Sequence, residues 1–256
     1  HLTEDQKNRL SKIITENADD FLKTGPPTPH TEHRINTEAS PPISAPPYRL
    51  TPIKRKPMEE EVKKMLEEDI IEELESPWAA PVVLIPKPDG GIRFCVDYRQ
   101  LNAITITDHY PPPRIDNLLH MTTRTAYMTT MDLRAGYWQI GVYKPDRNKT
   151  AFITPFGTYQ FKRMPFGLQN APATFQRLID CIETNLNKIT LLAYLDDLII
   201  ISITFEKHLD DLHQTPQLLR RYGLRVSRDK CKSCCKTAKF LGHVLIAEGI
   251  STDPGK

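Results

Sequence analysis

An apolar run late in the chain is interrupted by two acidic residues. It extends over residues 191–201 and carries Asp196 and Asp197 at its centre. A run of this kind predicts two short buried strands joined by a tight turn, with both carboxylates at the turn. Aspartate is a common turn residue, so a simple hairpin tip is one interpretation. Two carboxylates about 4 Å apart repel by roughly 4 kcal/mol near a protein surface. A divalent cation would remove that repulsion, which makes metal binding the other interpretation.

Helical periodicity predicts four helices around this hairpin. The first spans residues 2–23 and precedes a proline-rich connector, residues 24–57, in which the prolines should exclude regular helix. A second helix is expected over residues 58–75, with one apolar face, and a third over residues 173–186, beginning at Pro172. The fourth, residues 204–222, contains Pro216, which removes one backbone hydrogen bond and should kink, break or weaken the helix.

Two further strand patterns carry polar residues at informative places. Residues 82–85 and 92–96 form a predicted hairpin, with the turn at residues 87–91. Alternation along the second strand directs Arg93 away from the apolar face, near Lys87 at the tip. On the pattern alone, the favoured interpretation of these side chains is two solvated cations on a loop.

A third carboxylate ends the strand predicted over residues 125–133. Asp132 alone is typical of a cap. If this strand lies beside the Asp196-Asp197 hairpin, three carboxylates converge, and such a set suits Mg²⁺ with positions left open for phosphate oxygens. Two such ions would activate an attacking hydroxyl and stabilise leaving pyrophosphate. The pattern therefore indicates nucleotidyl transfer.

The charge and cysteine patterns change this picture little. The formal net charge of +2 combines an acidic stretch at residues 59–75 with a basic tract at residues 220–239, which is either a solvated face or a phosphate-binding surface. No apolar stretch approaches the length of a membrane span, and no signal peptide is visible, so we expect no membrane partner. Five cysteines indicate a reducing compartment. A zinc cluster at Cys231, Cys234 and Cys235 is disfavoured by its spacing, and Cys95 and Cys181 are expected to be buried.

Several motifs, in order, resemble reverse transcriptases of gypsy-type long-terminal-repeat retrotransposons. Tyr194-Leu195-Asp196-Asp197 resembles their YxDD box, and the segment from Met131 to Ile140 resembles their first aspartate motif. Four further segments resemble other motifs of this family: residues 76–83, 96–102, 163–176 and 240–244. The similarity extends from about residue 31 to the last residue.

The resemblance implies an α+β fold with the fingers and palm of a right-hand polymerase, an antiparallel palm sheet packed on helices, and a thumb that is largely absent. The implied division is residues 1–57 as N-terminal helix and connector, 58–106 and 140–170 as fingers, 107–139 and 171–250 as palm with the primer grip, and 251–256 as the start of a truncated thumb or connection. Because the first residue is His1, we expect a piece of a longer polyprotein, fused to protease, RNase H and integrase domains.

The resemblance also assigns roles to individual residues. It implies that Asp132, Asp196 and Asp197 are catalytic and hold the metal ions, helped by the Leu133 carbonyl. The residues that it places around the incoming nucleotide are Lys87, Arg93, Tyr137, Phe166, Gly167 and Gln169. The Tyr137 ring would lie under the sugar and exclude a 2′-hydroxyl, which favours deoxyribonucleotides. Leu241, Gly242 and His243 resemble the primer grip.

The expected activity is therefore RNA-directed DNA polymerisation, in which the primer 3′-hydroxyl attacks a dNTP. The expected cofactors are two Mg²⁺ ions, with Mn²⁺ as a substitute, and the expected partners are an RNA or DNA template with its primer. The expected location is intracellular, in a cytoplasmic virus-like particle with nuclear entry. Two alternatives stay open: a non-catalytic nucleic-acid-binding remnant of such an element, and an RNA-copying RNA polymerase, which Tyr137 disfavours.

Overall fold

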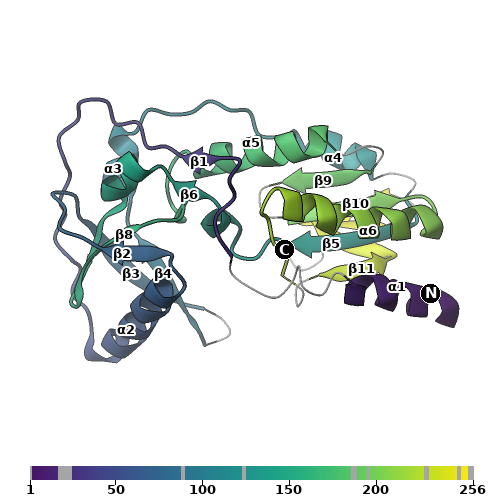
Figure 1. Cartoon of the computed structure of the whole chain (residues 1–256), viewed down its shortest axis with the longest axis horizontal. Coiled ribbons are helices and arrows are strands. Elements are labelled where there is room, and N and C mark those ends of the chain that lie inside the picture. Colours follow the sequence, from purple (N-terminus) through teal and green to yellow (C-terminus); the bar gives the residue numbers. More distant parts are fainter. Residues whose placement is uncertain are drawn as a thin grey trace. The chain divides into compact units, whose positions relative to one another are not determined.

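The computed structural model describes residues 2–16, 25–87, 90–122, 125–185, 189–194, 197–227, 231–246 and 249–252. The chain forms two compact units (Figure 1). Unit 1 comprises residues 1–30, 110–136 and 175–256, and unit 2 comprises residues 31–109 and 137–174. Both units combine helices with sheets. The α+β class predicted from the sequence is therefore confirmed, whereas the boundaries of fingers and palm stay a prediction.

Unit 1 contains a four-stranded antiparallel sheet and a separate three-stranded one. The larger sheet has the order β11-β5-β10-β9 and the smaller the order β12-β13-β14. The strands are β5 (Tyr127–Asp132), β9 (Leu191–Tyr194), β10 (Asp197–Ser202), β11 (Lys232–Cys235), β12 (Thr237–Phe240), β13 (His243–Ile246) and β14 (Gly249–Thr252). The helices are α1 (Glu4–Glu16), α4 (Ile115–Met121), α6 (Phe205–Arg221) and most of α5 (Ala171–Thr184), whose first turn belongs to unit 2. The predicted hairpin of two buried strands is confirmed as β9 and β10.

The two faces of the larger sheet pack against different elements. Side chains alternate between faces along a strand, so Met128, Ile199 and Ile201 share one face. They form a buried core with Leu118 of α4 and with residues of β12 and β13. Helix α6 contacts β10 and β5, with which it overlaps in Figure 1. The sheet is therefore buried on both sides, which explains why β10 is apolar along almost its whole length.

Helix α6 is continuous through its proline. Its N-cap, Thr204, accepts a hydrogen bond from the Lys207 N–H (3.3 Å), as is typical of a threonine cap. Pro216 is buried within the helix. The Thr215 hydroxyl donates to the Asp211 carbonyl one turn earlier (2.8 Å). The predicted helix is confirmed, and Pro216 does not break it.

Unit 2 is built on a five-stranded mixed sheet in the order β2-β8-β7-β3-β4, in which only β3 and β7 pair in parallel. Its strands are β2 (Ile71–Glu73), β3 (Ala80–Pro86), β4 (Ile92–Val96), β7 (Phe152–Thr154) and β8 (Gly157–Phe161), with a short parallel pair of β1 (Glu32–His33) and β6 (Gly141–Val142). Its helices are α2 (Pro52–Glu67), α3 (Arg99–Ile104) and the 3₁₀ helix η3 (Lys144–Thr150), and a further 3₁₀ helix, η2 (Gly136–Gln139), spans the division between the units. Met58, Val62 and Met65 of α2 pack on this sheet.

The predicted limits of the second helix are wrong at both ends. Helix α2 begins at Pro52, inside the segment that the prolines were expected to keep extended, and includes Pro57. Proline is tolerated in the first helical turn because the N–H that it lacks has no partner there, so Pro52 starts the helix. The helix ends at Glu67 because Asp69 adopts a positive φ of 55° and residues from Ile71 onward pair with β8.

Among the described helices, none is long and apolar enough to cross a membrane.

Candidate functional site

The strand register of unit 1 brings two of the three predicted acidic residues together. Strands β5 and β10 pair antiparallel, and Asp132 lies directly opposite Asp197. Directly opposite residues in such a pair have Cα atoms about 4.5–5.5 Å apart and direct their side chains to the same face. Tyr194 of β9 lies opposite Asp197 on the other side and shares this face. Two carboxylates from separate stretches of sequence therefore meet at one end of the two central strands of the sheet.

The backbone after Asp132 is held by a segment from the far end of the chain. The Ser227 N–H donates to the Asp132 carbonyl (2.8 Å), and the Arg134 N–H donates to the Arg225 carbonyl (3.0 Å). Leu133 forms a β-bridge with Val226 between these two bonds. Leu133 as a whole residue is only 1% exposed, and because its side chain has no donor atom, only its backbone carbonyl could contribute to an ion. These contacts fix the position from which Asp132 projects.

The third acid, Asp196, lies outside the described residues, as does Leu195. Among the residues that the structure describes, no group of three His, Cys, Asp or Glu side chains could hold a metal ion. The described part of the site supplies two hard oxygen donors on one face, half-buried Asp132 and exposed Asp197. Carboxylates placed in this way fit Mg²⁺, which retains open positions for waters or phosphate oxygens.

The predicted basic hairpin of unit 2 is confirmed as β3 and β4. Ile85 lies opposite Arg93 in this hairpin, and both are exposed, whereas Leu84 and Phe94 face the core. The Lys87 N–H donates to the Gly91 carbonyl (2.8 Å), which closes the turn. The Lys87 and Arg93 side chains are therefore both solvent-accessible in unit 2, as phosphate binding would require.

Tyr137 and Phe166 form one aromatic stack in unit 2. Their ring centroids are 5.0 Å apart with an interplanar angle of 27°. Tyr137 is only 8% exposed, whereas Phe166 is 52% exposed. The Phe166 ring thus offers most of the accessible aromatic surface of the pair. Any base or sugar that approaches this stack would contact Phe166 extensively.

A residue that the sequence analysis missed holds the loop that carries Gly167 and Gln169. The Asn102 side chain of α3 donates to the Gly167 carbonyl (2.8 Å) and accepts from the Gln169 N–H (2.9 Å). Gly167 has a φ of +91°, a backbone conformation that residues with a Cβ rarely adopt. The Gln169 side chain donates to the Thr107 hydroxyl (2.6 Å). The loop is therefore fixed by side-chain hydrogen bonds, and only the position of Asn102 within the motif at residues 96–102 hints at this role.

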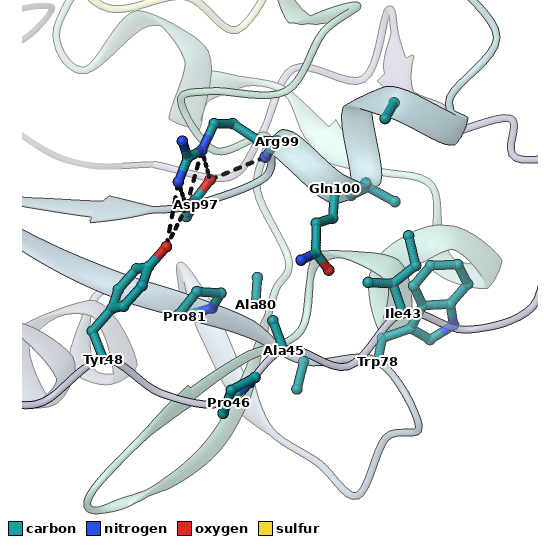
Figure 2. A pocket seen from close by; sticks show the side chains of 13 residues that line it. Ile43, Ala45, Pro46, Tyr48, Trp78, Ala80, Pro81, Asp97, Arg99 and Gln100 are labelled. Carbon is teal, nitrogen blue, oxygen red and sulfur yellow. Dashed lines mark hydrogen bonds and ion pairs between the residues drawn. The ribbon is translucent and has the colours of Figure 1, made fainter.

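A pocket of about 430 Å³ lies beside α3, within unit 2 (Figure 2). Among its lining residues, Arg99 donates to Asp97 (2.6 Å), and the Tyr48 hydroxyl donates to the same carboxylate (2.8 Å). The Arg99 hydrogen bonds, with a smaller contribution from Tyr48, outweigh burial and hold the pKa of Asp97 well below its usual range. Trp78 and Ile43 line the apolar end (Figure 2). The pocket thus combines an apolar wall with an exposed guanidinium.

The predicted primer-grip residues form a tight hairpin in unit 1. Phe240 pairs with His243, so Leu241 and Gly242 make a two-residue loop. Both loop residues have positive φ, 52° and 73°, as a type I′ turn requires. The His243 Nδ1 lies 3.0 Å from the Leu241 carbonyl. Leu241 and Tyr194 both pack against the core formed by β5, β10 and β13, so this hairpin and the acidic hairpin share one core.

Among the described residues, the cysteines do not belong to any group of three His, Cys, Asp or Glu side chains that could hold a metal ion. All five are free. Cys234 is buried, and the Cys231 thiol donates to the Ser227 carbonyl (3.0 Å). The expectation that Cys181 is buried is wrong because this residue lies on an exposed position of α5, and Cys95 is only half-buried. The zinc interpretation is not supported by the described residues.

Comparison with known proteins gives a consistent family. Residues 85–245 match the family described as reverse transcriptase (RNA-dependent DNA polymerase). The chain is 37% identical to the "Retrovirus-related Pol polyprotein from transposon 297" of Drosophila melanogaster over 100% of this chain and 25% of that protein. The corresponding polyprotein from transposon gypsy, also from Drosophila melanogaster, is 34% identical over 77% of this chain and 20% of its own length. The chain thus spans about a quarter or less of these curated relatives.

Solved structures share the fold. A crystal structure of the prototype foamy virus protease-reverse transcriptase is 25% identical, with a TM-score of 0.88 over 98% of this chain and 34% of that chain. A foamy viral protease-reverse transcriptase in complex with an RNA/DNA hybrid is 22% identical, with a TM-score of 0.90 over 100% of this chain and 35% of that chain. The second likeness bears on the fold alone. The predicted polymerase architecture is confirmed.

Proposed function

Because the chain belongs to the reverse transcriptase (RNA-dependent DNA polymerase) family, we propose that it catalyses RNA-directed DNA synthesis within a longer retrotransposon polyprotein. The observation that carries the proposal is the register of β5 against β10, which places Asp132 opposite Asp197 on one face. A polymerase needs its acidic residues together at one point, and sequence proximity alone does not bring residues 132 and 197 together. The gypsy-type resemblance of the sequence agrees with its curated relatives.

The end of the β5–β10 pair that carries Asp132 and Asp197 would hold the metal ions needed for the chemistry. Members of this family use divalent metal ions. We propose two Mg²⁺ ions, replaceable by Mn²⁺, bound by Asp132, Asp197 and Asp196 with help from the Leu133 carbonyl. Such ions activate the primer 3′-hydroxyl and neutralise charge on the phosphates. The protein's own contribution is to present carboxylates whose separation is fixed by the sheet.

The side chains of unit 2 would bind the nucleotide. Arg93 and Lys87 are exposed and cationic, and Arg can form paired hydrogen bonds with phosphate oxygens, whereas Lys acts as a point charge. The Tyr137–Phe166 stack would contact the sugar and disfavour ribonucleotides. Gly167 and Gln169, fixed by Asn102, would line the same nucleotide site.

The proposed partners are a template and a primer. In unit 1 the Leu241-Gly242-His243 turn would support the primer end, and in unit 2 Arg99 would contact template phosphates. The curated relatives are Pol polyproteins, so we propose fusion to protease, RNase H and integrase domains. The proposed location is a cytoplasmic virus-like particle with nuclear entry.

Primer extension on poly(rA)/oligo(dT) with dTTP and Mg²⁺ tests the proposal. Asp197→Asn should reduce extension by about a thousandfold, because it weakens the binding of the ions that would neutralise the charge developing in the transition state. Asp210→Asn, an exposed position on α6, is the matched control and should retain wild-type extension. Extension by the Asp197→Asn protein at the control's rate would refute the proposal.

The two alternatives predict different results in the same assay. A non-catalytic remnant would bind primer-template without incorporating dNTP, even though its acids are in register. An RNA-copying RNA polymerase would prefer rNTPs. We expect dNTP incorporation in direct competition, and Tyr137→Ala should weaken the preference by roughly 10-fold or more, since pocket contacts of this size discriminate by about 10–200-fold.

A further inference from the structure

A buried polar chain lies on the sheet face opposite the two aspartates. Its members come from α6 and from strands β5 and β10, and each is at most 5% exposed: Thr129, Ser202, His208 and Asp211. Thr129 pairs with Ile200, and strand alternation directs both away from the face of Asp132 and Asp197. Nothing in the proposed chemistry uses these side chains.

The donors and acceptors of this buried polar chain can be assigned in one consistent way. The Ser202 hydroxyl donates to Asp211 (2.8 Å), because an ionised carboxylate only accepts. Ser202 therefore accepts from His208 Nδ1–H (2.9 Å), and the other ring nitrogen, Nε2, accepts from the Thr129 hydroxyl (2.8 Å). The Thr129 oxygen in turn accepts from the Cys234 N–H of β11 (3.0 Å). Each side chain of this buried polar chain therefore has a hydrogen-bonding partner.

The remaining contacts keep this arrangement in place. Lys207 forms an ion pair with the second oxygen of Asp211. Burial, and then the charge of Lys207, lowers the pKa of His208 to about 4, so the ring is neutral near pH 7 and can both donate and accept. A register shift in β11 and the positive φ of Cys234 (52°) accompany the bond from the Cys234 N–H to Thr129. The imidazole thus connects β5 and β10 directly, and Thr129 extends the same hydrogen-bonded chain to β11.

The apolar pattern of the strands does not specify their register. Leu198, Ile199, Ile200 and Ile201 are apolar in succession, so a slip of one residue would still bury apolar side chains on both faces. The same slip would turn the aspartates away from each other, because each one-residue shift reverses the face of every side chain. A buried polar contact between defined positions can exclude the slipped register, since a misplaced Ser or Thr would leave polar groups without partners.

We propose that His208 is a positioning residue for the catalytic aspartates. By bonding Thr129 of β5 and Ser202 of β10 at once, its ring fixes the register that places Asp132 opposite Asp197. The proposal rests on the proposed function for the meaning of that pair, but its main readout, metal affinity, does not require polymerase activity.

The test measures Mn²⁺ affinity by electron paramagnetic resonance in the folded protein, together with amide hydrogen exchange of β5 and β10. The main variant is the double substitution His208→Leu with Thr129→Val, which removes two hydrogen-bonding partners together and limits buried unpaired groups. We expect the Mn²⁺ dissociation constant to rise by roughly 10-fold to 100-fold, as for other residues that orient metal ligands. Exchange in β5 and β10 should accelerate. His213→Leu, an exposed histidine of the same helix, is the matched control and should change neither.

A second variant covers the case in which the double variant fails to fold. His208→Asn keeps a donor toward Ser202 and loses the bond to Thr129, and it should show the same weakening of Mn²⁺ binding. Folded variants that bind Mn²⁺ within twofold of wild type, with unchanged exchange in β5 and β10, would overturn the proposal. Asp197→Asn separates the two hypotheses: if it leaves Mn²⁺ affinity unchanged, the proposed metal site fails, whatever His208 does.

Discussion

The two units of this protein present functional side chains in different ways. In unit 1, Asp132 and Asp197 are placed by strand register and backbone hydrogen bonds, so their separation is a property of the sheet. In unit 2, Lys87 and Arg93 are long side chains that extend into solvent from a hairpin. Metal ions demand fixed ligand geometry, whereas phosphate groups of an incoming nucleotide can be met by mobile cations. The difference predicts separate kinetic consequences for the two units.

The largest expected effect is in unit 1. Asp132→Asn should lower kcat for primer extension by about a thousandfold or more and leave the KM for dNTP nearly unchanged, because the loss acts on the transition state. Steady-state extension at saturating primer-template measures both constants. A large rise in KM with an unchanged kcat would show that Asp132 binds substrate rather than supporting the chemistry, and would remove the contrast between the units.

The next effect concerns the pH dependence of the unfolding free energy. Both units contain a buried histidine that contributes to it. Burial, opposed in part by Asp146 and Asp108, lowers the pKa of His33 in unit 2 to about 4, as burial does for His208 in unit 1. The unfolded chain takes up these protons near pH 6.5 and the folded protein only near pH 4. The stabilisation is therefore complete above pH 6.5 and is lost as the pH falls toward 4, by up to about 3 kcal/mol per histidine.

Urea unfolding at pH 7.5, 6 and 5 measures this loss. His33→Gln and His208→Gln should each flatten the pH dependence while lowering the stability at pH 7.5. An unfolding free energy that stays constant between pH 7.5 and pH 5 in the wild-type protein would contradict the burial of neutral histidines in both units.

A smaller kinetic effect is expected in unit 2. Arg93→Gln should raise the KM for dNTP by roughly 10-fold, the value of one hydrogen bond to a charged group, with kcat changed much less. Arg49→Gln, an exposed arginine of the same unit, is the control. Equal losses of kcat and kcat/KM would place Arg93 in the transition state and contradict the idea that unit 2 only binds.

The smallest effect is expected on α5. Burial, with a smaller contribution from the charge of Asp180, raises the pKa of Glu183 to about 7. The folded protein therefore holds a proton that the unfolded chain releases near pH 4.5, so this group's stabilisation is lost as the pH rises through 7. Glu183→Gln should raise the melting temperature slightly at pH 8 and have little effect at pH 5. A variant less stable than wild type at pH 8 would contradict this sign.

The sequence predicted those features that depend on local pattern. The ends of β5, β9 and β10 follow from apolar runs that stop at acids, and the β3–β4 hairpin follows from alternation around a glycine turn. The sequence did not predict the features that depend on contacts between residues far apart in the chain. Asn102 holds a loop more than sixty residues away, and His208 bridges two strands that its own helix covers. The early start of α2 was missed because proline was taken to exclude helix, although it suits the first turn.

The proposed metal site requires the register that places Asp132 opposite Asp197. A crystal soaked with Mn²⁺, analysed by anomalous scattering, tests it directly. We expect anomalous density at the end of the β5–β10 pair, within bonding distance of both carboxylates, and its loss in Asp197→Asn crystals. Mn²⁺ bound elsewhere, or at this end with Asp132 turned away, would contradict the proposed site.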